Sequence, residues 1–98
     1  MAQYWLFISA DVMTSGHTAK LGTIFVRDHL LGILKQEGNV AVSFAAFNGG
    51  INVMIATGWN SRRNRSVFRQ SLSFRELVSK TKHLLVQGKY EIELQMEE

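Results

Sequence analysis

The sequence contains no cysteine. This absence excludes disulfide scaffolds, thiolate metal sites and thiol catalysis, and it suits a protein of the cytosol. Long apolar runs are also missing, because the run at residues 4–10 is about half as long as a signal peptide needs. No stretch approaches the roughly 20 apolar residues of a membrane span. We therefore expect a cytoplasmic protein that does not enter a membrane.

Recognisable catalytic and cofactor motifs are absent as well. The glycines match no phosphate-binding loop and no dinucleotide pattern. His17, His29 and His83 are not spaced as metal ligands. Asp11 follows a predicted strand near His17, but an aspartate in this context is more typical of a turn or a cap. The sequence therefore predicts a protein that is not an enzyme and that holds no metal and no small-molecule cofactor.

The length of 98 residues and the apolar content of 46% suffice for one hydrophobic core. Residues 3–10 are rich in aromatic and β-branched side chains, as a strand is. Further along the chain, some segments have the apolar spacing of helices and others have the alternation of strands. We therefore expect one α+β domain over residues 1–98.

The clearest predicted element is a hairpin of residues 40–47 and 51–58. Asn48 and Gly49 supply the turn chemistry of a tight hairpin, which needs positive φ angles. With these two residues as the loop, Phe44 lies opposite Val53. One face of the hairpin then collects most of its large apolar side chains, as a core-facing sheet should.

A helix is predicted over residues 74–87. Ser73 and Glu76 form a capping box, apolar residues recur at helical spacing, and Gly88 supplies a left-handed stop. Residues 89–96 then alternate apolar side chains with acidic or amide side chains, which predicts a half-buried strand.

Residues 17–37 allow two interpretations. A long helix fits a cap at Thr14 or Ser15 and a stop at Gly38, although its two internal glycines weaken it by about 1 kcal/mol each. The alternative makes residues 19–26 a second strand and keeps a shorter helix after it. We favour the long helix, which leads to the order βαββαβ, whereas the alternative leads to ββαββαβ.

The order βαββαβ predicts a ferredoxin-like two-layer sandwich, an antiparallel sheet with two helices on one face. The other face is then open, and we expect on it Trp5, Phe7, Ser9, Ala41, Ala45, Phe47, Met54, Ala56, Glu91 and Glu93. An exposed apolar strip of this kind marks an interface. We therefore expect a homodimer whose contacts include Trp5, Phe7, Phe47 and Met54.

The positive charge is concentrated in one segment of the chain. Residues 60–89 carry eight Arg and Lys side chains against one acid, whereas residues 90–98 carry four Glu side chains. The first 59 residues carry three charges of each sign. This asymmetry identifies the basic segment as the candidate functional surface.

Residues 60–72 are the densest part of this segment, an arginine-rich connection too long to be structureless in a compact domain without a function. Guanidinium groups match phosphate oxygens, and aromatic rings stack on unpaired bases. The sequence therefore predicts a small non-enzymatic protein that contacts nucleic acid through Arg62, Arg63, Arg65, Arg69, Lys80, Lys82, Trp59 and Phe68. The alternative is a phage- or plasmid-type inhibitor whose basic loop docks on an acidic partner protein. A third interpretation pairs the loop with the chain's own acidic tail.

Overall fold

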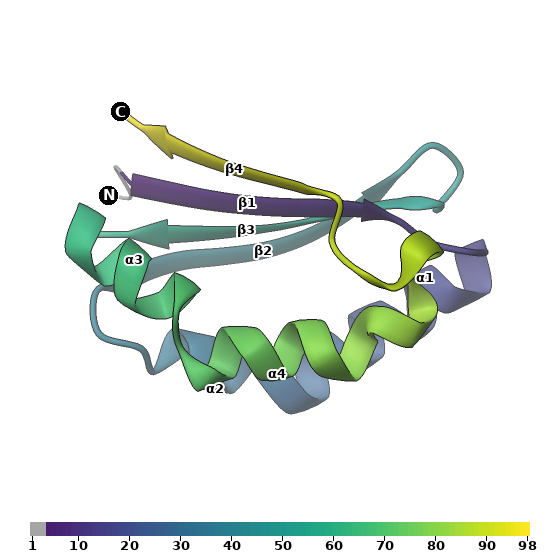
Figure 1. The fold of residues 1–98 in the computed structure, drawn as a ribbon, viewed down its shortest axis with the longest axis horizontal. Coiled ribbons are helices and arrows are strands. Elements are labelled where there is room, and N and C mark those ends of the chain that lie inside the picture. Colours follow the sequence, from purple (N-terminus) through teal and green to yellow (C-terminus); the bar gives the residue numbers. More distant parts are fainter. Residues whose placement is uncertain (1–3) are drawn as a thin grey trace.

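The computed structural model describes residues 4–98 as a sheet of four antiparallel strands with all the helices on one of its faces (Figure 1). In chain order the elements are β1 Tyr4–Asp11, α1 Ser15–Ile24, η1 Phe25–Leu30, α2 Leu31–Leu34, β2 Asn39–Phe47, β3 Asn52–Trp59, α3 Arg62–Arg69, α4 Leu72–Thr81, η2 Lys82–Leu84, η3 Val86–Gly88 and β4 Ile92–Glu97. The strands lie in the order β2-β3-β1-β4. The predicted ferredoxin-like sandwich is confirmed.

The first helical segment is continuous from α1 through η1 to α2, and the alternative with a strand at residues 19–26 is wrong. The Thr14 hydroxyl caps its start by accepting from the amide of His17 at 3.1 Å. The middle part, η1, has π-helical geometry. Its wider turn keeps Phe25, His29 and Ile33, four residues apart, on the buried side.

The hairpin between β2 and β3 forms with a register that differs from the predicted one by two residues. Phe44 lies opposite Ile55, and a loop of residues 48–51 replaces the two-residue turn. The longer loop needs positive φ angles at Asn48, Gly49 and Gly50, which glycine and asparagine adopt at little cost. A shift of two residues keeps every side chain on its predicted face, so Val53 and Ile55 are buried as expected.

The faces of β4 are the reverse of the predicted ones. Its apolar residues pair with the open-face residues of β1, Leu94 with Phe7 and Met96 with Trp5. Glu93 pairs with Ile8 and therefore lies on the face that carries the helices. The open face thus gains apolar side chains, and the expectation that Glu93 lies on it is wrong.

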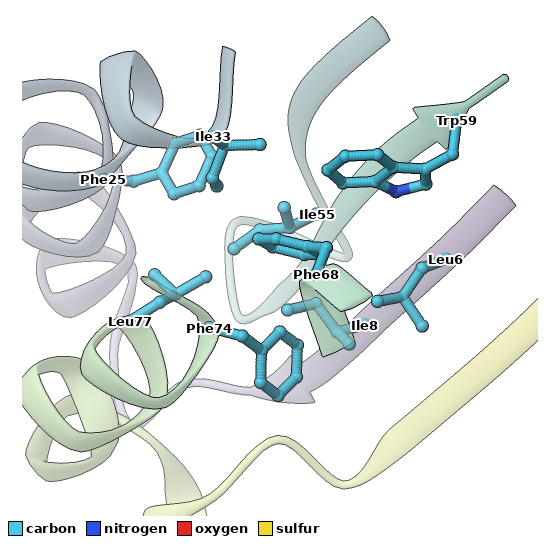
Figure 2. Packing of buried hydrophobic residues seen from close by; sticks show 9 residues of the cluster. All are labelled: Leu6, Ile8, Phe25, Ile33, Ile55, Trp59, Phe68, Phe74 and Leu77. Atoms are coloured by element: carbon cyan, nitrogen blue, oxygen red, sulfur yellow. The ribbon is translucent and has the colours of Figure 1, made fainter. Parts of the chain in front are cut away.

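The segment at residues 60–72 is not a loop, because most of it is the helix α3. The Ser61 hydroxyl caps it by accepting from the amide of Asn64 at 3.0 Å. The next helix, α4, is capped by Ser71 rather than by Ser73, and its start precedes the predicted one by two residues. Both helices are oriented by their buried aromatic residues, and Figure 2 shows Phe68 and Phe74 pointing toward one another.

Ion pairs with α3 hold β4 in place. The Arg62 guanidinium donates to both carboxylate oxygens of Glu97, at 2.7 and 2.9 Å. Arg65, which is only 4% exposed, donates to Glu97 and to the carbonyl of Met96, both at 3.1 Å. Arg69 donates to Glu93. The basic segment therefore neutralises part of the acidic tail within the chain.

Gly38 sits at a close contact between the first helical segment and α3. Its φ angle is +80°, and a Cβ built on it would lie within 2.5 Å of both Asn60 and Asn64. Gly49 has a similar φ of +70° but faces open space.

We expect Gly49→Ala to reduce the unfolding free energy by about 1–2 kcal/mol, the cost of left-handed backbone, and Gly38→Ala to reduce it by more. Urea unfolding measures both, and equal losses would contradict the contact.

The pairing with Arg62, and secondarily with Arg65, lowers the pKa of Glu97 from 4.5 to about 2. Because the folded-state pKa is depressed, the resulting stability is fully present above about pH 4.5 and is lost as the pH falls toward 2. We expect Glu97→Gln to be less stable than the wild type at pH 7 and equally stable near pH 2. Denaturant unfolding across this range measures the difference. Glu91→Gln, which removes a charge just before β4 that pairs with no arginine of α3, is the control and should match the stability of the wild type at pH 7.

Candidate functional site

The residues predicted from the sequence to bind nucleic acid do not form one surface. Trp59 and Phe68 are 0% and 1% exposed, and their rings stack on each other at 4.8 Å in the core (Figure 2). They are therefore inaccessible to bases. Arg62, Arg65 and Arg69 are engaged by glutamates of β4.

The three remaining predicted residues are exposed but separate. Arg63 lies on α3, Lys80 near the end of α4, and Lys82 at the start of η2. None of the three has an ion pair within residues 4–98. Lys82 lines the cavity described next, together with Arg69, whereas Arg63 and Lys80 do not. The structure thus brings two of the eight predicted residues to one site.

A cavity of about 430 Å³ lies between α4, the sheet and the segment that enters β4. In Figure 1 this segment runs from the end of the α4 layer across to the edge of the sheet. The residues that line the cavity are Ile8, Arg69, Phe74, Arg75, Val78, Ser79, Lys82, Lys89, Tyr90 and Glu93. The volume falls within the range of small-molecule sites in proteins, about 300–1,000 Å³.

The cavity combines an apolar floor with a cationic border. Ile8 and Phe74 belong to the hydrophobic core, and Val78 and Tyr90 pack against it. Four of the other lining residues are cations, and only Glu93 is an acid. The Arg69 guanidinium lies 4.5 Å from the centre of the Phe74 ring. This distance is within the range of a cation–π contact. This lining suits a molecule with an apolar body and a negative charge.

Tyr90 adds a hydroxyl group to the apolar floor. Burial raises the pKa of its phenol above the ordinary value of 10. The phenol is therefore protonated at neutral pH. In the sequence, Tyr90 is only one of the alternating apolar residues of the strand predicted at 89–96, and no pattern there marks it as part of a site.

The residues predicted for a dimer interface lie together on the open face. Trp5 and Phe7 stack at 5.6 Å on β1. Met54 and Phe7 line an apolar hollow with Ile92, Leu94 and Met96. Phe47, which is 42% exposed, lies at the end of β2 near the hairpin loop.

Two further structural features bear on the class of protein. Among residues 4–98, no three His, Asp or Glu side chains are grouped as metal ligands would be. No helix in this part of the chain has the length and apolarity that crossing a membrane requires. The cytoplasmic location expected from the sequence stays a prediction.

Comparison with known proteins gives matches of structure but not of sequence. Neither a family model nor a curated protein matches the chain. A Streptomyces coelicolor monooxygenase from the gene ActVA-Orf6, in complex with the ligand Nanaomycin D, matches with a TM-score of 0.84 at 16% identity, over 99% of this chain and 88% of that one. A Nitrosomonas europaea protein of unknown function, NE2512, matches with a TM-score of 0.79 at 17% identity, over 100% and 90%. An antibiotic biosynthesis monooxygenase matches with 0.74 at 9% identity, over 97% of both chains.

These matches correct the functional predictions made from the sequence. The predictions of a nucleic-acid-binding protein, of an inhibitor and of a non-enzyme are wrong, because the similar structures with a described activity are monooxygenases. The physical reason is that three of the four arginines of α3 pair with the chain's own glutamates and that the aromatic residues are buried. The chain has the ferredoxin-like fold of antibiotic biosynthesis monooxygenases.

Proposed function

We propose that the protein binds a small organic molecule with an apolar body and an anionic group, and acts on it as a monooxygenase. The observation that carries the proposal is the cavity of about 430 Å³ beside α4, with its apolar floor and cationic border. The activity is supported by the fold neighbours described as monooxygenases, one of them in complex with Nanaomycin D.

The charges on the cavity border indicate where the anionic group binds. Glu93 already accepts from Arg69, so the charge of Arg69 is largely compensated. Arg75, Lys82 and Lys89 have no ion pair within residues 4–98. These three cations are therefore free to contact an anion at the mouth, while its apolar body lies on the floor.

For one class of substrate, a monooxygenase reaction needs no reductant other than the substrate itself. When a phenol is oxidised to a quinone, one atom of O2 enters the ring, the other leaves as water, and the substrate supplies the electrons. Loss of the phenol proton makes the ring electron-rich, and nearby cations stabilise the resulting phenolate. We therefore propose that the substrates are phenols with an apolar body.

Naphthoate and hydroxynaphthoate are suitable fluorescent probes of the cavity. We expect the double variant Lys82→Gln/Lys89→Gln to bind them about 3- to 10-fold more weakly, because exposed charge pairs contribute roughly 0.3–0.7 kcal/mol each. Fluorescence titration measures the dissociation constants, and an oxygen electrode measures O2 uptake with hydroxynaphthoate.

The matched control is Lys80→Gln, which removes an exposed charge two residues from Lys82 but outside the cavity. It should leave both dissociation constants unchanged. Equal weakening by the control would show that only net charge matters and would contradict the cavity as the site. If hydroxynaphthoates bind to the protein but none of them causes O2 uptake, the monooxygenase activity is contradicted.

We also propose that two copies of the chain pair through their open faces. Along the four strands this face carries one charged side chain, Asp11 at one end, and beyond β4 the Glu98 carboxylate accepts from the Trp5 indole at 3.1 Å at the other end. The middle of the face is therefore uncharged, and two copies that meet there avoid like-charge repulsion despite the net charge of +3. Ile92, Leu94 and Met96 are each about half exposed and enlarge the predicted patch. The apolar contact would reduce the exposure of these side chains to water.

If the chain forms this dimer, one charged substitution on the open face should dissociate it. Leu94→Glu should convert a dimer into a monomer, because two carboxylates would face an apolar interface. Leu31→Glu, at a residue 61% exposed on the helical layer, is the control and should stay dimeric. Analytical ultracentrifugation measures the mass, and a monomeric wild type at high protein concentration would contradict the interface.

A further inference from the structure

Tyr90 is the aromatic hydroxyl of the cavity, and its hydrogen bonds are poorly satisfied. Its hydroxyl oxygen lies 3.4 Å from the hydroxyl oxygen of Thr81. Hydrogen bonds between hydroxyl groups are normally about 2.5–3.0 Å long. The contact with Thr81 is therefore weak.

The neighbouring hydroxyl determines the direction of this contact. Thr81 Oγ1 donates its only proton to the carbonyl of Leu77, one turn earlier in α4. Thr81 consequently accepts from Tyr90 rather than donating to it. The proton of Tyr90 is held by one long bond to a residue outside the cavity lining. A rotation of this proton toward the cavity, which the Tyr90 side chain lines, would exchange that weak bond for one to a bound molecule.

The electrostatics of the floor differ from those of the border. The border offers cations, which favour a full negative charge. Tyr90 is a neutral donor that lies on an apolar floor with Ile8, Phe74 and Val78. A neutral donor in apolar surroundings favours an uncharged or partly charged oxygen, such as a carbonyl or hydroxyl, and costs free energy when it has no partner.

We propose that the Tyr90 hydroxyl donates a hydrogen bond to an oxygen atom on the apolar body of the bound molecule, so that the cavity selects anions that carry such an oxygen. The inference rests on the proposed binding function of the cavity. It adds a second polar contact, separate from the cationic border, and thereby defines the orientation of the ligand.

The test compares naphthoate with the positional isomers of hydroxynaphthoate, titrated under nitrogen to prevent oxidation. The wild type should bind at least one isomer about 5- to 10-fold more tightly than naphthoate, as expected for one hydrogen bond. Tyr90→Phe should abolish this preference and leave the affinity for naphthoate within about twofold. Tyr4→Phe, which changes the only other tyrosine, should keep the preference.

The outcomes separate the two proposals. If naphthoate and all its hydroxy isomers fail to bind the wild type, the binding function of the cavity is overturned and the role of Tyr90 with it. If naphthoate binds but no isomer is preferred, or if Tyr90→Phe keeps the preference, only the role of Tyr90 is overturned.

A second readout uses the phenol of Tyr90 itself. In Tyr4→Phe, Tyr90 is the single tyrosine, so the NMR signal of a 13C-labelled tyrosine ring reports its ionisation separately from that of the ligand's own hydroxyl. A ligand oxygen that accepts from the hydroxyl stabilises the protonated phenol and should raise the pKa of Tyr90 further. A bound hydroxynaphthoate that lowers this pKa would contradict the direction of the hydrogen bond.

Discussion

The pairing between the arginines of α3 and the glutamates of β4 determines how the last strand is seated. Arg65 is buried, and its guanidinium donates only to Glu97 and to the Met96 carbonyl within residues 4–98. It also lies 6.0 Å from the centre of the Tyr4 ring. Leaving this guanidinium unpaired in the interior would cost several kcal/mol. The acidic side of β4 must therefore face the helices, although its other side is apolar. Two features follow from this constraint, the enlarged apolar open face and a cavity wall that carries Glu93.

Local patterns in the sequence predicted most of the fold. The Thr14 cap and the positive φ angles at Asn48, Gly49 and Gly50 each act within a few residues of the element they define, and each was found in the structure. The hairpin loop is longer than predicted, and the first helical segment ends at Leu34, before Gly38. The faces of β4 could not be predicted in this way, because alternation defines two faces without saying which one is covered. That choice depends on α3, which lies far away in the sequence. α3 itself was missed because only Arg65 and Phe68 are buried in it, too few for a helical pattern.

The candidate site was less predictable than the fold, for a related reason. Its lining comes from β1, α3, α4, η2, the segment before β4 and β4 itself, and the contact of β1 and β4 with α3 and α4 is not visible in the sequence alone. The basic segment overlaps the candidate site, because its Lys82 and Arg69 line the cavity. The assignment to nucleic acid failed because charge was visible in the sequence, whereas the glutamate partners and the burial of Trp59 were not.

The structure places six of the eight cations of the basic segment in two groups with different surroundings. Arg62, Arg65 and Arg69 are compensated by carboxylates and act in folding, where opposite charges lower the cost of burying a guanidinium. Arg75, Lys82 and Lys89 lie beyond the reach of those carboxylates and border an apolar cavity. Charges of this second kind gain most from an anion that also covers the apolar floor, since displacement of water strengthens their attraction. A hydrophobic anion therefore satisfies both parts of the cavity, whereas inorganic phosphate would satisfy only its border.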